Sequence, residues 1–251
     1  MLIALPVSQA DSKLALQLVE FIAGLGGIRP HKWFLAFAES CPDSHRKSIE
    51  LQAARSGDIA ASVILEKITE KGWPLSCNAM FGAVARLIAK AGAYGEPCWY
   101  FFEADNTPLV PQWADILQAE YTKAKMPCMG YLNDTNLRRP SGVRYVDGQH
   151  LVGTGIYPPN FYYDCRLMKF LGNAARAFDV YLQWEVVPQT HPTNELIQHN
   201  WITEKYKKVG SDILCSSKAA HTKGAYSKAV RSDAVVLHGC KDGSLMKLLS
   251  K

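Results

Sequence analysis

Two carboxylates follow an aromatic run near the middle of the chain. Residues 99–102 are four consecutive aromatic residues, and Glu103 and Asp105 come directly after them. Bulky aromatic side chains are typical of a buried strand, and residues two apart in a strand point the same way. Buried carboxylates are costly unless something pairs with them, and a divalent cation carrying a diphosphate would do so. Pro108 is expected to end the strand ladder after them. The alternative is a pair of solvated turn carboxylates at a strand end.

A histidine and a lysine near the C-terminal end could complete such a site. His238 follows the last predicted strand, and Lys241 lies three residues later in a turn that contains Gly239 and Gly243. Hard oxygen ligands with one imidazole suit Mn²⁺ or Mg²⁺, so Asp105 and His238 are the predicted metal ligands. Lys241 could contact a phosphate as a point charge, where the glycines let the backbone approach. The alternative for His238 is a hydrogen-bonded histidine at a strand end.

Several common motifs are absent from the sequence. It has no GxxxxGK[ST] phosphate loop, no GxGxxG after the first strand, no HExxH helix and no GxSxG nucleophile elbow. Residues 8–13 also lack the glycine-rich signature that nucleotidyltransferases carry after their first strand. The acidic triplet and the late histidine therefore remain the main chemical features.

The first half of the chain alternates strands and helices. Apolar runs and helical periodicity predict strands over 2–7, 33–38, 99–102 and 127–132, and helices over 11–24 (capped by Asp11), 44–54, 59–68, 78–91 and 113–123. Such alternation implies a mostly parallel sheet covered by helices. Ligands of such sheets bind at the carboxyl ends of the strands, where Ser8, Glu103 and Asp105 are expected.

The second half is less regular. We expect a glycine-interrupted strand from 151 that ends at the prolines 158 and 159, a helix over 165–178, a mobile stretch over 210–233 and a last strand over 235–237. No linker separates two parts, so a single domain over 1–251 is predicted.

Composition describes a soluble globular protein. Apolar residues make up 48% of the chain, the mean hydropathy is −0.09, and no run approaches the roughly 18 apolar residues that span a membrane. The N-terminus lacks the basic region of a signal peptide. The seven cysteines are scattered and form no CxxC pair, which favours reduced thiols and a cytoplasmic location.

Basic residues concentrate in the second half. Residues 126–251 carry a net charge of +6, against −1 for residues 1–125. Between Lys205 and Arg231 there are seven basic residues and one acidic residue, Asp212. Clustering of this kind suggests a polyanionic partner, and the alternative is a solvated surface loop.

At this point the chain resembles glycosyltransferases of the GT-A fold. The matching positions, in order, are Pro6-Val7-Ser8, Glu103-Ala104-Asp105, Gly153-Thr154-Gly155, Asp179 or Glu185, and His238 with Lys241. The resemblance implies a GT-A-like α/β fold. Its Rossmann-type, mostly parallel central sheet would have helices on both faces, a nucleotide-sugar-binding half over 1–125 and a less regular acceptor-side half over 126–251.

The resemblance also implies roles for these residues. Residues 6–8, Glu103 and Lys241 would bind a nucleotide-sugar, most often a UDP-sugar, and Asp105 with His238 would hold Mn²⁺ or Mg²⁺. The first acid is Glu rather than Asp, so Asp105 is the safer metal ligand. Asp179, or else Glu185, would be the acidic catalytic group of a hexosyl- or pentosyltransferase. Whether the anomeric configuration is retained or inverted stays open.

The acceptor is the least constrained partner. A compact basic chain without anchor or disulfides is similar to the enzymes with which bacteriophages glycosylate hydroxymethylated bases in their own DNA, in the host cytoplasm. Lys218, Lys223 and Lys228 would then contact phosphates of double-stranded DNA, and the target pyrimidine would leave the stack. The alternatives are a saccharide, protein or small-molecule acceptor, or a non-catalytic module that binds a nucleotide or nucleic acid. The oligomeric state stays open.

Overall fold

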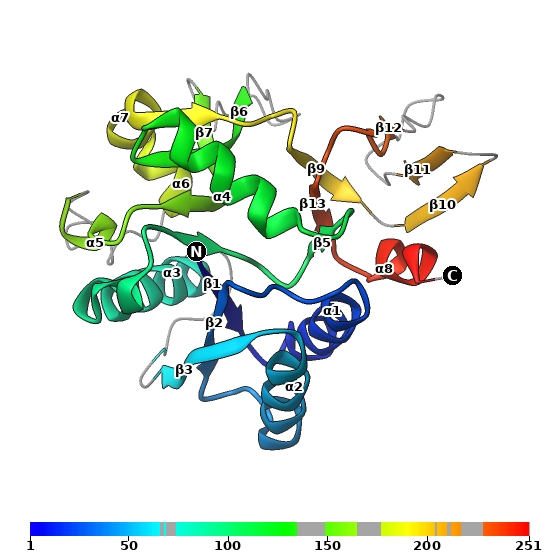
Figure 1. Cartoon of the computed structure of the whole chain (residues 1–251), viewed down its shortest axis with the longest axis horizontal. Coiled ribbons are helices and arrows are strands. Elements are labelled where there is room, and N and C mark those ends of the chain that lie inside the picture. The colour runs from blue at the N-terminus through cyan, green and yellow to red at the C-terminus, as the bar shows by residue number, and fades with distance from the viewer. Residues whose placement is uncertain are drawn as a thin grey trace.

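The computed structural model describes residues 1–65, 68, 74–134, 149–164, 177–203, 205–209, 212–216 and 228–250. Its main sheet has seven strands in the order β3-β2-β1-β4-β7-β6-β8. Figure 1 labels β1, β2, β3, β6 and β7 of this sheet. The strands are β1 (Leu2–Val7), β2 (Lys32–Ala38), β3 (Asp58–Leu65), β4 (Trp99–Phe101), β6 (Cys128–Asp134), β7 (Gln149–Tyr157) and β8 (Thr190–Pro192). Only the pairings of β7 with β4 and with β6 are antiparallel. The predicted α/β class with a mostly parallel central sheet is confirmed.

Helices cover both faces of this sheet because alternate residues of its inner strands are apolar on both sides. Ile3 and Leu5 of β1 belong to a buried cluster with residues of α1 (Ser12–Gly24), α2 (Asp43–Ser56) and α4 (Trp113–Ala124). Leu2 and Ala4 face the other way and belong to a second cluster with α3 (Leu75–Lys90). The aromatic strand β4 lies between these two layers and is fully buried.

The helix predicted over 59–68 is wrong, because residues 58–65 form the strand β3 beside β2. A short apolar run has spacings that fit either structure, and length alone decides poorly between them. Its Ile and Val residues favour a strand, since β-branched side chains pack well on a pleated surface. Gly57, in extended conformation, ends α2 immediately before β3.

A smaller sheet crosses the carboxyl end of β4 and consists of β5 (Asn106–Pro108), β13 (Val236–Cys240) and β9 (Ile197–Thr203). β13 runs antiparallel to β5 and parallel to β9. The aromatic strand β4 ends at Phe101, before the two carboxylates, and Pro108 is the last residue of β5, where it pairs with Val236. Neither β5 nor β9 is predicted from the sequence.

The remaining described elements lie in the second half or are short. A third sheet has the order β10-β11-β12, with β10 (Lys205–Val209), β11 (Asp212–Ser216) and β12 (Lys228–Ala229), so part of the stretch expected to be mobile is regular. The others are α5 (Phe161–Asp164), α6 (Phe178–Tyr181), α7 (Gln183–Val186), α8 (Ser244–Leu249) and the 3₁₀ turns at Gly92–Gly95 and Val187–Gln189. Most of the helix predicted over 165–178 lies outside the described residues. Among the helices that the structure describes, none has the length and apolarity required to cross a membrane.

Candidate functional site

Three potential metal ligands converge where β4 meets the smaller sheet. Glu103 and Asp105 lie in the loop between β4 and β5, and β13 brings His238 opposite Asn106 of β5. The Nε2 atom of His238 lies 3.1 Å from Glu103 Oε2 and 3.2 Å from Asp105 Oδ1. One ligand atom of each residue lies within 4.8 Å of the others. We call these three residues the acidic cluster.

Lys241 and a tight turn complete the acidic cluster. The Nζ atom of Lys241 lies 3.1 Å from Asp105 Oδ2. The backbone N–H groups of Gly239 and Cys240 donate to the carbonyl oxygen of Asp105, at 3.1 and 3.0 Å. Gly239 has φ +111°, and a Cβ there would lie 2.1 Å from the carbonyl oxygen of Asn200. Only glycine fits this turn, so the glycine that follows His238 fixes where Asp105 and Lys241 meet.

The charges of the acidic cluster support one another. Burial alone would raise the pKa of Asp105, but the His238 and Lys241 cations hold it well below its usual range. Burial alone would lower the pKa of His238, but Asp105 and Glu103 raise it to about 10. The Asp105 carboxylate likewise raises the pKa of Lys241. Without a metal ion, the protonated His238 and Lys241 supply two positive charges against the two carboxylates. Two carboxylate oxygens with one imidazole form a donor set that suits Mn²⁺ or Mg²⁺.

Thr154 connects this loop to β7. Its hydroxyl lies 3.0 Å from the carbonyl oxygen of Phe101 and 3.1 Å from Asn106 Oδ1. The Nδ2 group of Asn106 in turn donates to the carbonyl oxygen of Glu103 at 2.9 Å. Thr154 and Asn106 are fully buried, so this network holds the Glu103 turn against β7.

Phe178 fixes the position of α6 over the same part of β7. Its ring stacks on Phe81 of α3, with centroids 3.7 Å apart and planes 10° apart. Its backbone N–H donates to Asn78 Oδ1 at 2.8 Å. A Cβ at Gly153 would lie 2.9 Å from the Phe178 ring, so the glycine leaves the room this ring needs. Asp179 is thereby placed beside β7.

Asp179 and Glu185 have different surroundings. The Asp179 carboxylate accepts the Val180 N–H at 2.9 Å. Burial raises the pKa of Asp179 to about 6, and the charge of Glu103 adds to the rise against the hydrogen bonds from the backbone. Glu185 is exposed on α7, and its backbone carbonyl accepts the Gln189 side chain at 2.8 Å. No described contact joins the Glu185 carboxylate to the acidic cluster.

A further acid, Asp11, lies between the end of β1 and the start of α1, where the sequence predicts a helix cap. Pro6 and Val7 are the last residues of β1, and the Ser8 hydroxyl that follows donates to Asp11 Oδ2 at 2.6 Å. Asp11 occupies the position before α1, but its side chain makes no capping hydrogen bond, so the predicted cap is wrong. Its charge instead contributes to the raised pKa of Lys241. Asp11 therefore lies close enough to Lys241 to favour its charged form.

Of the three lysines predicted to contact nucleic acid, the structure describes only one. Lys218 and Lys223 lie outside the described residues, and Lys228 lies in β12. The third sheet contacts the strand that carries His238 through the side chain of Tyr206 on β10. Tyr206 belongs to a buried cluster with Leu237 and Cys240 of β13, and its N–H donates to Ser244 Oγ at 2.9 Å.

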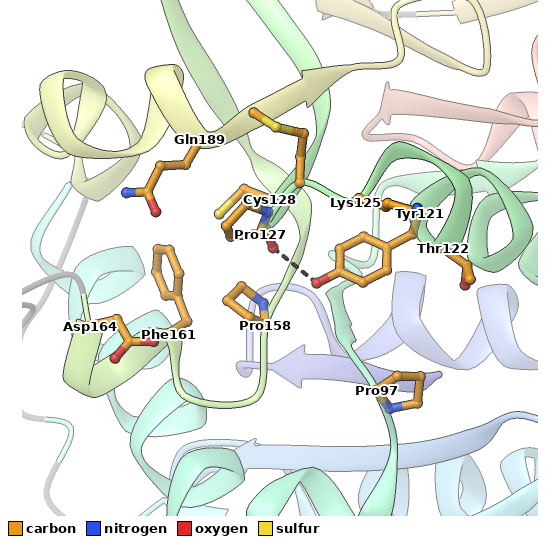
Figure 2. Close-up of a pocket in the computed structure, with 11 residues that line it drawn as sticks. Pro97, Tyr121, Thr122, Lys125, Pro127, Cys128, Pro158, Phe161, Asp164 and Gln189 are labelled. Atoms are coloured by element: carbon orange, nitrogen blue, oxygen red, sulfur yellow. Dashed lines mark hydrogen bonds between the residues drawn. The ribbon is translucent and has the colours of Figure 1, made fainter.

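A separate hollow lies at the opposite edge of the main sheet. It encloses about 590 Å³ near the start of β6 and the end of β7, with Pro127 and Pro158 in its wall (Figure 2). The Tyr121 hydroxyl donates to the Pro127 carbonyl at 3.0 Å across one side, as the dashed line in Figure 2 shows. The hollow shares no lining residue with the acidic cluster. We therefore base the functional site on the acidic cluster.

The partly buried Asp179 carboxyl gives a stability prediction. Its pKa is raised from 3.8 to about 6, so the folded chain keeps a proton that the unfolded chain loses as pH rises through this window. The free energy of unfolding is therefore highest below the pKa of Asp179 in the unfolded chain. It falls by up to about 3 kcal/mol as pH rises, until the pKa of Asp179 in the folded chain is passed. We expect Asp179→Asn to remove this loss. Urea unfolding of both proteins from about pH 4 to pH 7 measures it, and parallel pH profiles would contradict the assignment.

The fold has counterparts among solved structures, although no protein-family model and no curated protein matches the sequence. An active-site mutant of LgtC aligns over 100% of this chain and 95% of its own, at 7% identity and a TM-score of 0.57. The galactosyltransferase LgtC with donor and acceptor sugar analogs aligns over 97% of this chain and 88% of its own, at 6% identity and a TM-score of 0.54. These likenesses extend over nearly the whole chain and concern the fold. The chain therefore has a GT-A-like fold, as the order of its motifs predicted.

Proposed function

We propose that this protein is a glycosyltransferase that moves a sugar from a nucleotide-sugar donor to a hydroxyl acceptor with the help of a divalent cation. The observation that carries the proposal is the acidic cluster. On a GT-A-like sheet, two carboxylates and the Nε2 atom of His238 converge at the carboxyl end of β4, with a lysine 3.1 Å from one of them. The donor we propose is a UDP-sugar.

Glu103, Asp105 and His238 would hold Mn²⁺ or Mg²⁺, which when bound neutralises the charge that develops on a diphosphate leaving group. Lys241 supplies a second positive charge from the chain itself. Its side chain is 73% exposed, so it can turn from Asp105 towards a phosphate without a large desolvation cost. The residues 6–8 at the end of β1 lie where a nucleotide binds in such sheets.

Asp179 is the acid that we propose for the acceptor side. Its pKa of about 6 lies close to neutral pH, where a general base combines the correct protonation state with useful basicity. The carboxylate could accept the proton of the acceptor hydroxyl, or stabilise the oxocarbenium-like sugar as its bond to the donor breaks. The fixed backbone around Phe178 keeps this side chain beside β7, whereas Glu185 is exposed.

A panel of nucleotide-sugars with Mn²⁺, assayed for release of the nucleoside diphosphate, tests the proposal. We expect release from UDP-sugars that stops when a chelator removes the cation. Binding of UDP without release from any donor would favour the alternative of a non-catalytic nucleotide-binding module. The proposal would be overturned if the protein neither bound UDP nor released a nucleoside diphosphate from any donor.

The acceptor that we propose is a hydroxymethylated pyrimidine in double-stranded DNA. The segment between Lys205 and Arg231 holds seven basic residues and one acidic residue, and its described strands form the third sheet. This sheet packs through Tyr206 against Leu237 and Cys240 of β13, the strand that carries His238. A duplex bound along the basic segment would thus pass near the donor site.

Salt dependence distinguishes this acceptor from a saccharide, protein or small molecule. Each phosphate contact releases counterions, so the logarithm of DNA affinity should fall with the logarithm of salt concentration by about 0.9 per contact. We expect joint replacement of Lys218, Lys223 and Lys228 by Gln to flatten this slope, while donor hydrolysis without acceptor is unchanged. Gel shifts from about 50 to 200 mM salt, on duplexes with and without hydroxymethylated pyrimidines, measure it. Negligible binding to every duplex would exclude DNA.

A further inference from the structure

A second buried histidine lies directly behind His238. β9 and β13 run parallel, and their register sets His199 opposite His238. The two Nδ1 atoms are 2.8 Å apart, and the ring centroids are 4.8 Å apart. Both residues are 8% exposed, so this contact is closed to bulk water. His199 thus touches the histidine of the acidic cluster at its Nδ1 atom, on the side of the ring opposite the Nε2 atom that faces Glu103 and Asp105.

The hydrogen bond defines which ring nitrogen carries each proton. A bond between two imidazole nitrogens needs one donor and one acceptor. The Nε2 atom of His238 faces Glu103 and Asp105. To bind a cation there, Nε2 must keep its lone pair free, so the ring proton of the neutral imidazole must be on Nδ1. His238 is then the donor and His199 the acceptor. When His238 instead carries both protons against the carboxylates, His199 is again the acceptor.

We propose that His199 is a positioning residue that fixes the tautomer and the ring direction of His238 and thereby tightens binding of the divalent cation. The inference rests on the proposed function, since it needs a cation at Glu103, Asp105 and His238. Outer partners of metal-binding histidines act in this way, and their loss typically weakens metal binding by about 10- to 100-fold. Tyr131 of β6 lies against His199, with ring centroids 5.5 Å apart, and limits its movement.

A matched pair of variants isolates the hydrogen bond from the packing. His199→Asn keeps a side-chain oxygen close to the place of Nδ1. His199→Leu has nearly the shape of that asparagine but offers no hydrogen-bond acceptor. Titration of Mn²⁺ into the protein without donor, followed by electron paramagnetic resonance, reports cation binding independently of turnover. We expect the leucine variant to bind Mn²⁺ about 10- to 100-fold more weakly, and the asparagine variant within a few-fold of wild type.

His191→Phe is the control for removing a histidine. Its Nε2 contacts Glu120 at 2.8 Å on α4, away from the acidic cluster, so Mn²⁺ affinity should not change. Thermal unfolding of each cation-free variant shows that it is folded, and His199→Phe, which keeps a ring against Tyr131, replaces the leucine variant if that one does not fold.

The outcomes separate this inference from the proposed function. Wild-type protein that binds no Mn²⁺ would remove the metal site and the inference with it. Wild-type protein that binds Mn²⁺ no more tightly than folded His199→Leu would overturn the positioning role alone. Equal weakening in the asparagine and leucine variants would also overturn it, because packing and not the acceptor would then be responsible.

Discussion

Replacing Asp105 by asparagine is expected to reduce sugar transfer by about a thousandfold or more, because several kcal/mol of transition-state stabilisation depend on its charge. Asp105 is 7% exposed and serves both halves of the site, with Oδ1 3.2 Å from His238 Nε2 and Oδ2 3.1 Å from Lys241 Nζ. The amide keeps the shape of the side chain but removes the negative charge that pairs with protonated His238 and with Lys241. Steady-state kinetics, together with calorimetric titration of UDP in the presence of Mn²⁺, measure the loss.

Asp115→Asn is the matched control for this experiment. Asp115 also pairs with a buried histidine, with Oδ1 3.0 Å from His31 Nε2, but His31 precedes β2 at the amino edge of the sheet. Its replacement should change turnover by less than about twofold, since surface-side changes away from the reacting groups have small effects. Unchanged UDP affinity in Asp105→Asn would remove Asp105 from the site. Equal losses in both variants would indicate general destabilisation.

Local sequence patterns predict the elements that are strongly apolar or have a clear helical period. The run Leu2–Val7 forms β1 over the predicted residues, and the helix predicted over 113–123 appears as Trp113–Ala124. The same reasoning fails for β3, where eight residues do not distinguish a 3.6 period from a strand. It also misses β5, which has only three residues and is defined by its pairing with β13.

The site was predictable to the extent that it follows from strand ends. Glu103 and Asp105 follow an aromatic strand, as the strand-end argument expects. The sequence predicts His238 after a strand over 235–237, but it lies within β13 (Val236–Cys240), and this strand brings it and Lys241 to the two acids. His199 could not be found in this way, because its role depends on the register between β9 and β13 and on a partner 39 residues away. β9 carries Gln198, His199 and Asn200 buried in succession, which no hydrophobic pattern reveals.

The choice between Asp179 and Glu185 shows what three-dimensional placement adds. Both acids follow the glycine-containing strand and flank the same aromatic patch, so sequence spacing cannot rank them. The stacking of Phe178 on Phe81 and the absence of a side chain at Gly153 hold α6 against β7, and Asp179 with it. Burial and the charge of Glu103 then tune this carboxyl, while the Glu185 side chain is exposed.

Asp179→Asn is expected to lower kcat by about 100- to 10,000-fold, the range that a positioned general acid or base contributes, and to leave UDP affinity within a few-fold of wild type. In the wild-type protein kcat should rise with pH through about 6 as the Asp179 carboxyl loses its proton, and the variant should lack this limb. Turnover against pH with a saturating UDP-sugar and Mn²⁺ measures both effects.

Glu185→Gln is the comparison. Turnover near that of wild type is expected because the Glu185 side chain is exposed and no described contact joins it to the acidic cluster. A large loss in Glu185→Gln with none in Asp179→Asn would reverse the two roles. A loss in both, with weakened UDP binding, would instead mean that this segment shapes the donor site and does not act on the acceptor.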